Sequence, residues 1–243
     1  MPPAAVAYLG SHFLSLLGNG VAAVALPLIV LQTTGSPLSG GAVSAATAVP
    51  ALLVGLCAGI VLDRVNRRTC SVLADVVSAV AVAAIPLVDM VWGLNLTWFI
   101  ALAIVGSFGD VPGMTARQVL VPAVARHTGM SLERLVGLRQ SMTSMALVIG
   151  PAAAGTLLSL FDGSTVLFAT AATSAAAALL TMVMPRRLGG IEADPGQREP
   201  LRAQLTMGVA VLRRSRFLTG TVALTVGLVV VIGGLQGLVL PLY

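Results

Sequence analysis

Residues 38–89 read LSGGAVSAATAVPALLVGLCAGIVL-DRVNRR-TCSVLADVVSAVAVAAIPLVD: a long apolar run, a short turn with three arginines and one aspartate, and a second apolar run. Crossing about 30 Å of hydrocarbon takes about 20 helical residues, and each run is long enough. The runs are continuous and do not alternate with period two, which favours helices over the strands of a membrane barrel. This stretch therefore predicts two transmembrane helices joined by a basic turn.

The same pattern recurs along the chain. We expect seven transmembrane helices, at about 7–31, 38–62, 69–89, 96–121, 140–161, 165–184 and 217–242. The composition agrees, because 57% of the residues are hydrophobic and only 9% are charged, whereas soluble domains carry roughly 25% charged residues. The predicted fold class is all-α, a polytopic membrane protein.

Every basic residue is an arginine, and all of them lie in the connections after the second, fourth and sixth expected helices, with Arg117 assigned to the inner end of the fourth helix. By connection they are Arg64, Arg67 and Arg68; Arg117, Arg126, Arg134 and Arg139; and Arg186, Arg187, Arg198, Arg202, Arg213, Arg214 and Arg216. Positive charge stays on the cytoplasmic side during insertion. We therefore expect a multi-pass protein of the cell membrane with a cytoplasmic N-terminus. On this interpretation the arginines set topology, and we expect no nucleic-acid partner.

Three segments organise the chain: a six-helix bundle (1–184), a cytoplasmic linker (185–216) and a seventh helix (217–243) that begins a second bundle. Within the linker, residues 201–214 place leucine and valine at helical spacing, which predicts an amphipathic helix on the inner membrane surface.

Motifs for catalysis or metal binding are missing from this sequence. The two cysteines, Cys57 and Cys70, do not form a CxxC pair, and His12 and His127 are expected at the periphery without metal partners. Neither an ATP-binding GxxxxGK[ST] loop nor a hydrolytic GxSxG occurs. We therefore expect that the protein is not an enzyme, that it has no catalytic residue and that it binds no cofactor or metal ion.

The turn after the second helix resembles the signature G-x-L-A-D-R-x-G-R-[KR] of the major facilitator superfamily. The matching residues are Gly59, Asp63, Arg64, Arg67 and Arg68; the departures are Val61, Leu62 and Asn66. Asn66 replaces a glycine, which is a mild change because asparagine tolerates the positive φ that a tight turn needs. The resemblance implies an inner gate in which Asp63 contacts a helix N-terminus of the other half-bundle, while the arginines pair with acids or lipid phosphates. An ordinary basic loop is the alternative.

The fifth helix resembles the antiporter motif of the same family. The residues concerned are Gly137, Ala146, Gly150, Pro151, Ala154 and Gly155. Small residues four apart let helices approach closely, so the resemblance implies a packing face that seals the bundle. Generic packing of an alanine-rich helix is the alternative. The first helix is similar to the branch that contains macrolide-efflux and enterobactin-export proteins.

Taken together, the resemblance implies a secondary active transporter that exports a small amphipathic molecule, coupled to protons. Its partners would be membrane lipid and a small-molecule substrate. Family members have two six-helix halves, whereas this sequence ends at Tyr243. We therefore expect a six-helix N-terminal bundle plus a seventh helix, from a truncated or partial sequence. The alternative is a non-transporting fragment or a half-transporter that needs a C-terminal partner chain.

A few polar side chains fall inside the predicted membrane spans. An ionisable group at mid-helix costs roughly 2.5–3.5 kcal/mol on insertion scales, so each needs a reason. Asp110, beside glycines and Pro112 that would let the helix bend, is the candidate for binding a proton or a cationic substrate, with Asn19 as a weaker candidate. A buried aspartate satisfied by a neighbouring helix is the alternative. Asp75 and Arg117 are expected at similar depth in the membrane and form a candidate structural ion pair. A role of these two residues in substrate binding is the alternative.

Overall fold

A computed structural model describes residues 1–62, 64–190, 215, 217–221, 223–224 and 227. These residues belong to two units, Met1–Glu192 and Ala193–Tyr243, which are treated separately. In the second unit, residues 217–221 are helical. Asp63, the predicted amphipathic helix at 201–214 and most of the predicted seventh helix lie outside the described residues.

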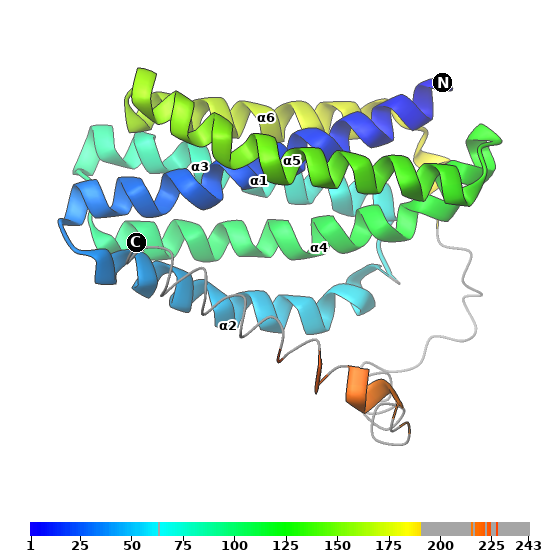
Figure 1. Cartoon of the computed structure of the whole chain (residues 1–243), viewed down its shortest axis with the longest axis horizontal. Helices are drawn as coiled ribbons and strands as arrows, with labels where there is room; N and C mark the ends of the chain where they lie inside the picture. Colours follow the sequence, from blue (N-terminus) through cyan, green and yellow to red (C-terminus); the bar gives the residue numbers. More distant parts are fainter. Residues whose placement is uncertain (63, 191–214, 216, 222, 225–226, 228–243) are drawn as a thin grey trace. The chain divides into compact units, whose positions relative to one another are not determined.

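The first unit is a bundle of long helices that lie side by side (Figure 1). Their bounds are α1 Pro3–Thr34, α2 Pro37–Leu62, α3 Arg67–Trp92, α4 Leu96–Thr128, α5 Leu132–Leu160 and α6 Gly163–Val183, followed by the 3-10 turn η1 Arg186–Gly189. Each of the six contains a segment long and apolar enough to cross a membrane. The described residues form no strand. The bundle confirms the predicted all-α, polytopic fold class.

Several helices extend beyond the apolar runs that predicted them. The run 96–121 belongs to a helix that continues to Thr128, and α5 begins at Leu132 instead of Gln140. Gly129, with a left-handed φ of 67°, ends α4, and the Ser131 side chain accepts a hydrogen bond from Arg134 N to begin α5. The expected loop is therefore a three-residue turn, and Arg126, Arg134 and Arg139 lie on helices.

Asn66 begins α3 in a way that the sequence comparison did not predict. Its φ is −54°, not positive, and its side-chain oxygen accepts hydrogen bonds from Arg68 N and Thr69 N. Asparagine is one of the preferred N-cap residues because its side chain satisfies such free N–H groups. Asn66 is therefore a helix cap, and the expectation of a positive φ is wrong.

Small residues allow the closest helix contacts. The main packing pairs are α3 with α4 and α6, α1 with α5 and α6, and α2 with α4. Where α1 meets α5, a Cβ atom added to Gly150 would lie 3.0 Å from the Cα atom of Gly20. Backbones approach this closely only where both residues are small.

The predicted packing face of α5 divides into two parts. Ala146, Gly150 and Ala154 are buried, and the added-Cβ distance places Gly150 against α1. Gly137, Pro151 and Gly155 are exposed, and a Cβ atom added to either glycine would meet no atom within 4 Å. Within the described bundle, only the first group packs against a neighbouring helix.

This division predicts a stability difference between two identical substitutions on α5. Gly150→Val should destabilise the bundle by about 1–3 kcal/mol, as overpacking does in well-packed cores, because the added atoms meet the Gly20 backbone. Gly155→Val should have little effect. Thermal unfolding of both variants in detergent, followed by circular dichroism, measures the difference; equal loss in both would contradict the packing described here.

Candidate functional site

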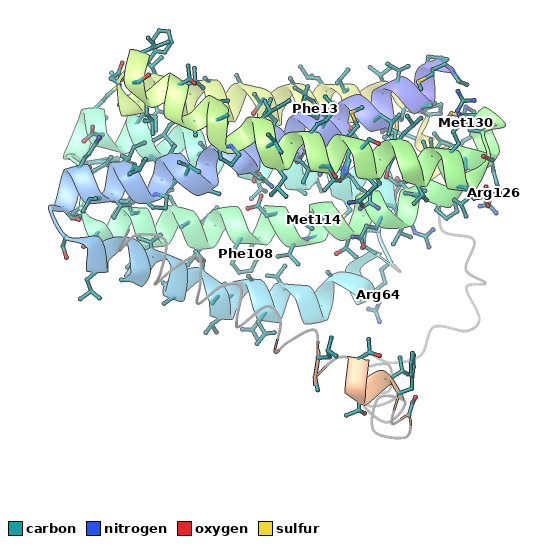
Figure 2. The ribbon with its side chains drawn as sticks, viewed as in Figure 1. Phe13, Arg64, Phe108, Met114, Arg126 and Met130 are labelled. Atoms are coloured by element: carbon teal, nitrogen blue, oxygen red, sulfur yellow. The ribbon has the colours of Figure 1, made fainter. Side chains whose placement is uncertain are left out.

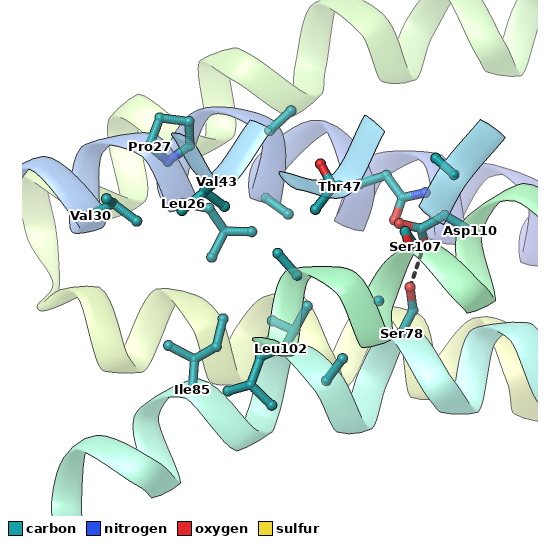
Figure 3. A pocket seen from close by; sticks show the side chains of 18 of the residues that line it. Leu26, Pro27, Val30, Val43, Thr47, Ser78, Ile85, Leu102, Ser107 and Asp110 are labelled. Carbon is teal, nitrogen blue, oxygen red and sulfur yellow. Dashed lines mark hydrogen bonds between the residues drawn. The ribbon is translucent and has the colours of Figure 1, made fainter. Parts of the chain in front are cut away.

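A cavity of about 480 Å³ lies between α1, α2, α3 and α4. Most of its lining is aliphatic, including Leu26, Val43, Ile85 and Leu102 (Figure 3). Its polar lining residues are Asn19 from α1, Thr47 from α2, Ser78 from α3, and Ser107 and Asp110 from α4. Apolar walls with a few placed polar groups are typical of sites for small molecules, and the volume is in the usual range.

Among the described residues that line this cavity, Asp110 carries the one charged side chain. Ser78 Oγ donates a hydrogen bond to its Oδ1 at 2.5 Å, drawn as a dashed line in Figure 3. Asn19 reaches the same cavity from α1, so the structure brings together the two residues that the sequence singled out as proton or substrate candidates. Their role stays a hypothesis.

Ser78 is a member of this site that the sequence analysis missed. It lies three positions after Asp75 on α3, and residues three apart share a face of a helix. That spacing was visible in the sequence, and together with the expected Asp75–Arg117 pair it would have placed Ser78 on the face that meets α4.

Glycines on α4 bring Asp110 to Ser78. A Cβ atom added to Gly109 would lie 2.6 Å from Ala74 O, and one added to Gly113 would lie 2.8 Å from Ala74 Cβ. Gly109 and Gly113 are four apart, the spacing of the small-residue motif that packs membrane helices closely. The α4 helix is continuous through Pro112. These glycines therefore set the distance between α3 and α4, a role that the sequence analysis did not assign to them.

Asp75 and Arg117 form a buried ion pair on the same two helices. Arg117 Nη2 donates to Asp75 Oδ2, and the residues are 4% and 3% exposed. Ser15 Oγ on α1 donates to Asp75 Oδ1 at 3.0 Å, and Tyr8 Oη donates to the Arg117 carbonyl at 2.9 Å. The pair thus joins α1, α3 and α4.

The signature turn contacts the end of α6. Arg68 is buried; its Nε donates to Thr181 O at 3.1 Å, and its Nη2 donates to Met182 O. Asn66 Nδ2 donates to Arg186 O at 3.1 Å. A cation is favourable at a helix C-terminus, where carbonyl groups are free. Arg68 is thus held by carbonyl groups of α6, and the expectation that it pairs with an acid or a lipid phosphate stays a prediction.

The other members of the predicted inner gate are less constrained. Gly59 and Arg64 are exposed and Arg67 is half-buried. Among the described residues, no acid lies within ion-pair distance of either arginine. Asp63, the central residue of the predicted gate, is outside the described residues.

His12 is buried, at 5% exposure, which corrects the expectation that it is peripheral. It is hydrogen-bonded through Nε2 to Thr143 Oγ1 at 3.0 Å and stacks on the Tyr8 ring. The part of the chain that the structure describes holds no group of three or more potential metal ligands. His12 therefore serves as a contact between α1 and α5.

The ion pair leads to a test by double-mutant cycle. Asp75→Asn and Arg117→Gln should each destabilise the protein by about 3–5 kcal/mol, because each leaves one buried charge without its partner. The double variant should lose less than the sum of the two. Denaturant unfolding in detergent measures the three free energies, with the exposed Arg134→Gln as a control for loss of charge. Additive losses would show that the two side chains are not coupled.

The family model described as "Major Facilitator Superfamily" matches residues 8–243. The chain is 32% identical to "Multidrug efflux pump Tap" of Mycolicibacterium fortuitum over 79% of this chain and 46% of that protein. It is 37% identical to the protein of the same name in Mycobacterium tuberculosis (strain ATCC 25618 / H37Rv) over 63% of this chain and 38% of that protein.

A further relative is "Uncharacterized MFS-type transporter YfiS" of Bacillus subtilis (strain 168), 25% identical over 96% of this chain and 55% of that protein. No solved structure gives a significant match. The chain spans about half the length, or less, of the curated relatives it matches. The family match covers almost every residue of the bundle described above, and the chain belongs to the major facilitator superfamily.

Proposed function

We propose that this chain takes part in secondary active efflux of a small amphipathic molecule, with the cavity between α1 and α4 as its portion of the substrate path. The observation that carries the proposal is the carboxyl group of Asp110 on an otherwise mostly aliphatic wall. The aliphatic part suits the apolar body of such a molecule, and the carboxylate suits a cationic end. Relatives named multidrug efflux pump support this choice.

Asp110 is a better coupling site than Asp75. The Arg117 guanidinium already compensates the charge of Asp75, whereas Asp110 accepts a hydrogen bond from a neutral hydroxyl, that of Ser78. A carboxylate that is costly to hold charged inside a membrane gains from binding either a proton or a cation. One such carboxylate can release its proton when it binds a cation and take up a proton when the cation leaves. This exchange is the elementary step of a proton antiporter.

The proposed orientation places the basic end of the bundle in the cytoplasm. At the opposite end, Trp92 at the end of α3 and Trp98 in the first turn of α4 stack with ring centroids 6.0 Å apart. Tryptophan is enriched at membrane–water interfaces. The arginine-rich turns and the tryptophan pair therefore mark the two surfaces of one bilayer.

A second candidate function is that of a subunit that transports only with a partner chain or C-terminal half. The exposed small residues Gly137 and Gly155 on α5 favour it, because they have room for another helix to approach. Reconstitution of this chain alone, and together with the C-terminal half of the Mycolicibacterium fortuitum pump, separates the two: transport only in the second case supports the subunit.

Asp110→Asn tests the proposed coupling site. In proteoliposomes that show proton-driven efflux of a lipophilic cationic dye, the variant should lose at least about tenfold in rate, because one charge-assisted contact is worth roughly 1.5–3 kcal/mol. Asp110→Glu should keep part of the activity. Asp89→Asn, which removes an exposed carboxylate, is the matched control and should transport normally. Normal proton-coupled transport by Asp110→Asn would refute the assignment.

Single-cysteine labelling tests the orientation. In a background without Cys57 and Cys70, a cysteine at Arg134 should react with an impermeant maleimide only after cells are opened, and one at Asp162 should react in intact cells. The reverse pattern would place the arginine-rich end outside and would overturn the proposed topology.

A further inference from the structure

A second cavity, of about 570 Å³, lies between α2 and α3 with α4 beneath it. We call it the α2–α3 groove; its lining includes Leu53 and Cys57 from α2, Cys70 and Leu73 from α3, and Phe108 and Pro112 from α4. It shares no lining residue with the first cavity. Apart from the two thiols its lining side chains are hydrocarbon, so it suits an alkyl chain better than a polar solute.

The groove is open to its surroundings, and its length along α2 is close to the hydrocarbon thickness of one lipid leaflet. Leu53, Leu73 and Phe108 are 58%, 56% and 55% exposed. On α2 it runs from Pro50 to Ala58, which is about 12 Å at 1.5 Å per residue. Half of a hydrocarbon core is about 15 Å, so one acyl chain matches this length.

Positive charge lies at one end of the groove. Val65 lines the groove and follows the exposed Arg64; Arg67 lies one helical turn before the lining residue Cys70 and so shares its face. Figure 2 shows Arg64 at the turn between α2 and α3, with its side chain directed away from the helices. Arg67 Nε is buried without a hydrogen-bond partner.

Charge complementarity selects the headgroup. The segment 63–68 carries one aspartate and three arginines, a net charge of +2. Arg68 is occupied by carbonyl groups of α6, whereas the described residues offer no acid to Arg64 or Arg67. Two guanidinium groups at the end of an apolar groove match a phosphate at the end of an acyl chain, and arginine binds phosphate with directed N–H groups.

We propose that the α2–α3 groove binds an anionic phospholipid, with one acyl chain along α2 and α3 and the phosphate between Arg64 and Arg67. The site is independent of the transport cavity and does not require that the proposed function be correct. It is a stoichiometric lipid site, distinct from the general solvation of the bundle by the bilayer.

The test uses the groove's own thiol. Cys57 is exposed, so a bound acyl chain should shield it from N-ethylmaleimide. In the full chain carrying Cys70→Ala, phosphatidylglycerol added to the micelles should slow Cys57 alkylation more than phosphatidylcholine at equal concentration. A basic residue near an anionic lipid surface strengthens binding about fivefold, so Arg64→Gln/Arg67→Gln should need roughly 25-fold more phosphatidylglycerol for equal protection.

Controls separate this site from general charge effects. Arg134→Gln removes an exposed arginine on α5. In this variant phosphatidylglycerol should protect Cys57 from alkylation as well as it does in the parent chain. Native mass spectrometry of the chain with both cysteines in place should show one retained phosphatidylglycerol, lost in the double arginine variant, and needs no cysteine substitution. Equal protection by the two lipids, or unchanged retention in the double variant, would overturn the proposal. Protection by a lipophilic cationic dye but not by phosphatidylglycerol would also overturn it and would assign the groove to substrate.

Discussion

Hydrocarbon cannot solvate a charge, and the placement of the ionisable side chains in this chain follows from that constraint. Asp75 meets Arg117 and Ser15 in the bundle interior. Arg68 meets two backbone carbonyl groups at the end of α6. Asp110 differs, because it accepts a hydrogen bond from the neutral hydroxyl of Ser78 and lines a cavity. The carboxylate with the weakest compensation is therefore the one best placed to bind a mobile cation.

The close packing of α3 on α4 makes this arrangement possible. Gly109 and Gly113 face the backbone and side chain of Ala74, and residues of the same helix pair, Ser78 with Asp110 and Asp75 with Arg117, interact along the same contact. A larger residue at either glycine would move the helices apart and lengthen both interactions. The ion pair and the cavity carboxylate thus depend on one helix contact, although they serve different purposes.

The sequence anticipated parts of the candidate site and misplaced others. Asp75, Arg117, Asp110 and Asn19 stand out because each is polar within an apolar run. His12 was expected at the periphery because it lies near the inner end of the first expected helix, yet it is buried between α1 and α5. Asn66 was compared with a family glycine and expected to adopt positive φ, but its side chain caps α3 instead. The two errors have different causes: the contact of His12 with Thr143 joins two helices and is not specified by its neighbours along the chain, whereas the Asn66 cap is local and was missed because Asn66 was compared with a glycine and not with the preferred N-cap residues.

What the sequence determined by itself is the number and approximate extent of the six described helices, their all-α membrane character, and the end of the bundle at which the arginines gather. Run length and charge placement are local properties, and the bilayer acts on them directly. Only the tertiary structure decided that Asn19 and Asp110 share a cavity, that Gly150 meets Gly20, and that Arg68 reaches α6. Those contacts depend on which face each helix turns to its neighbour, and in near-uniformly apolar helices the hydrophobic pattern does not specify that face.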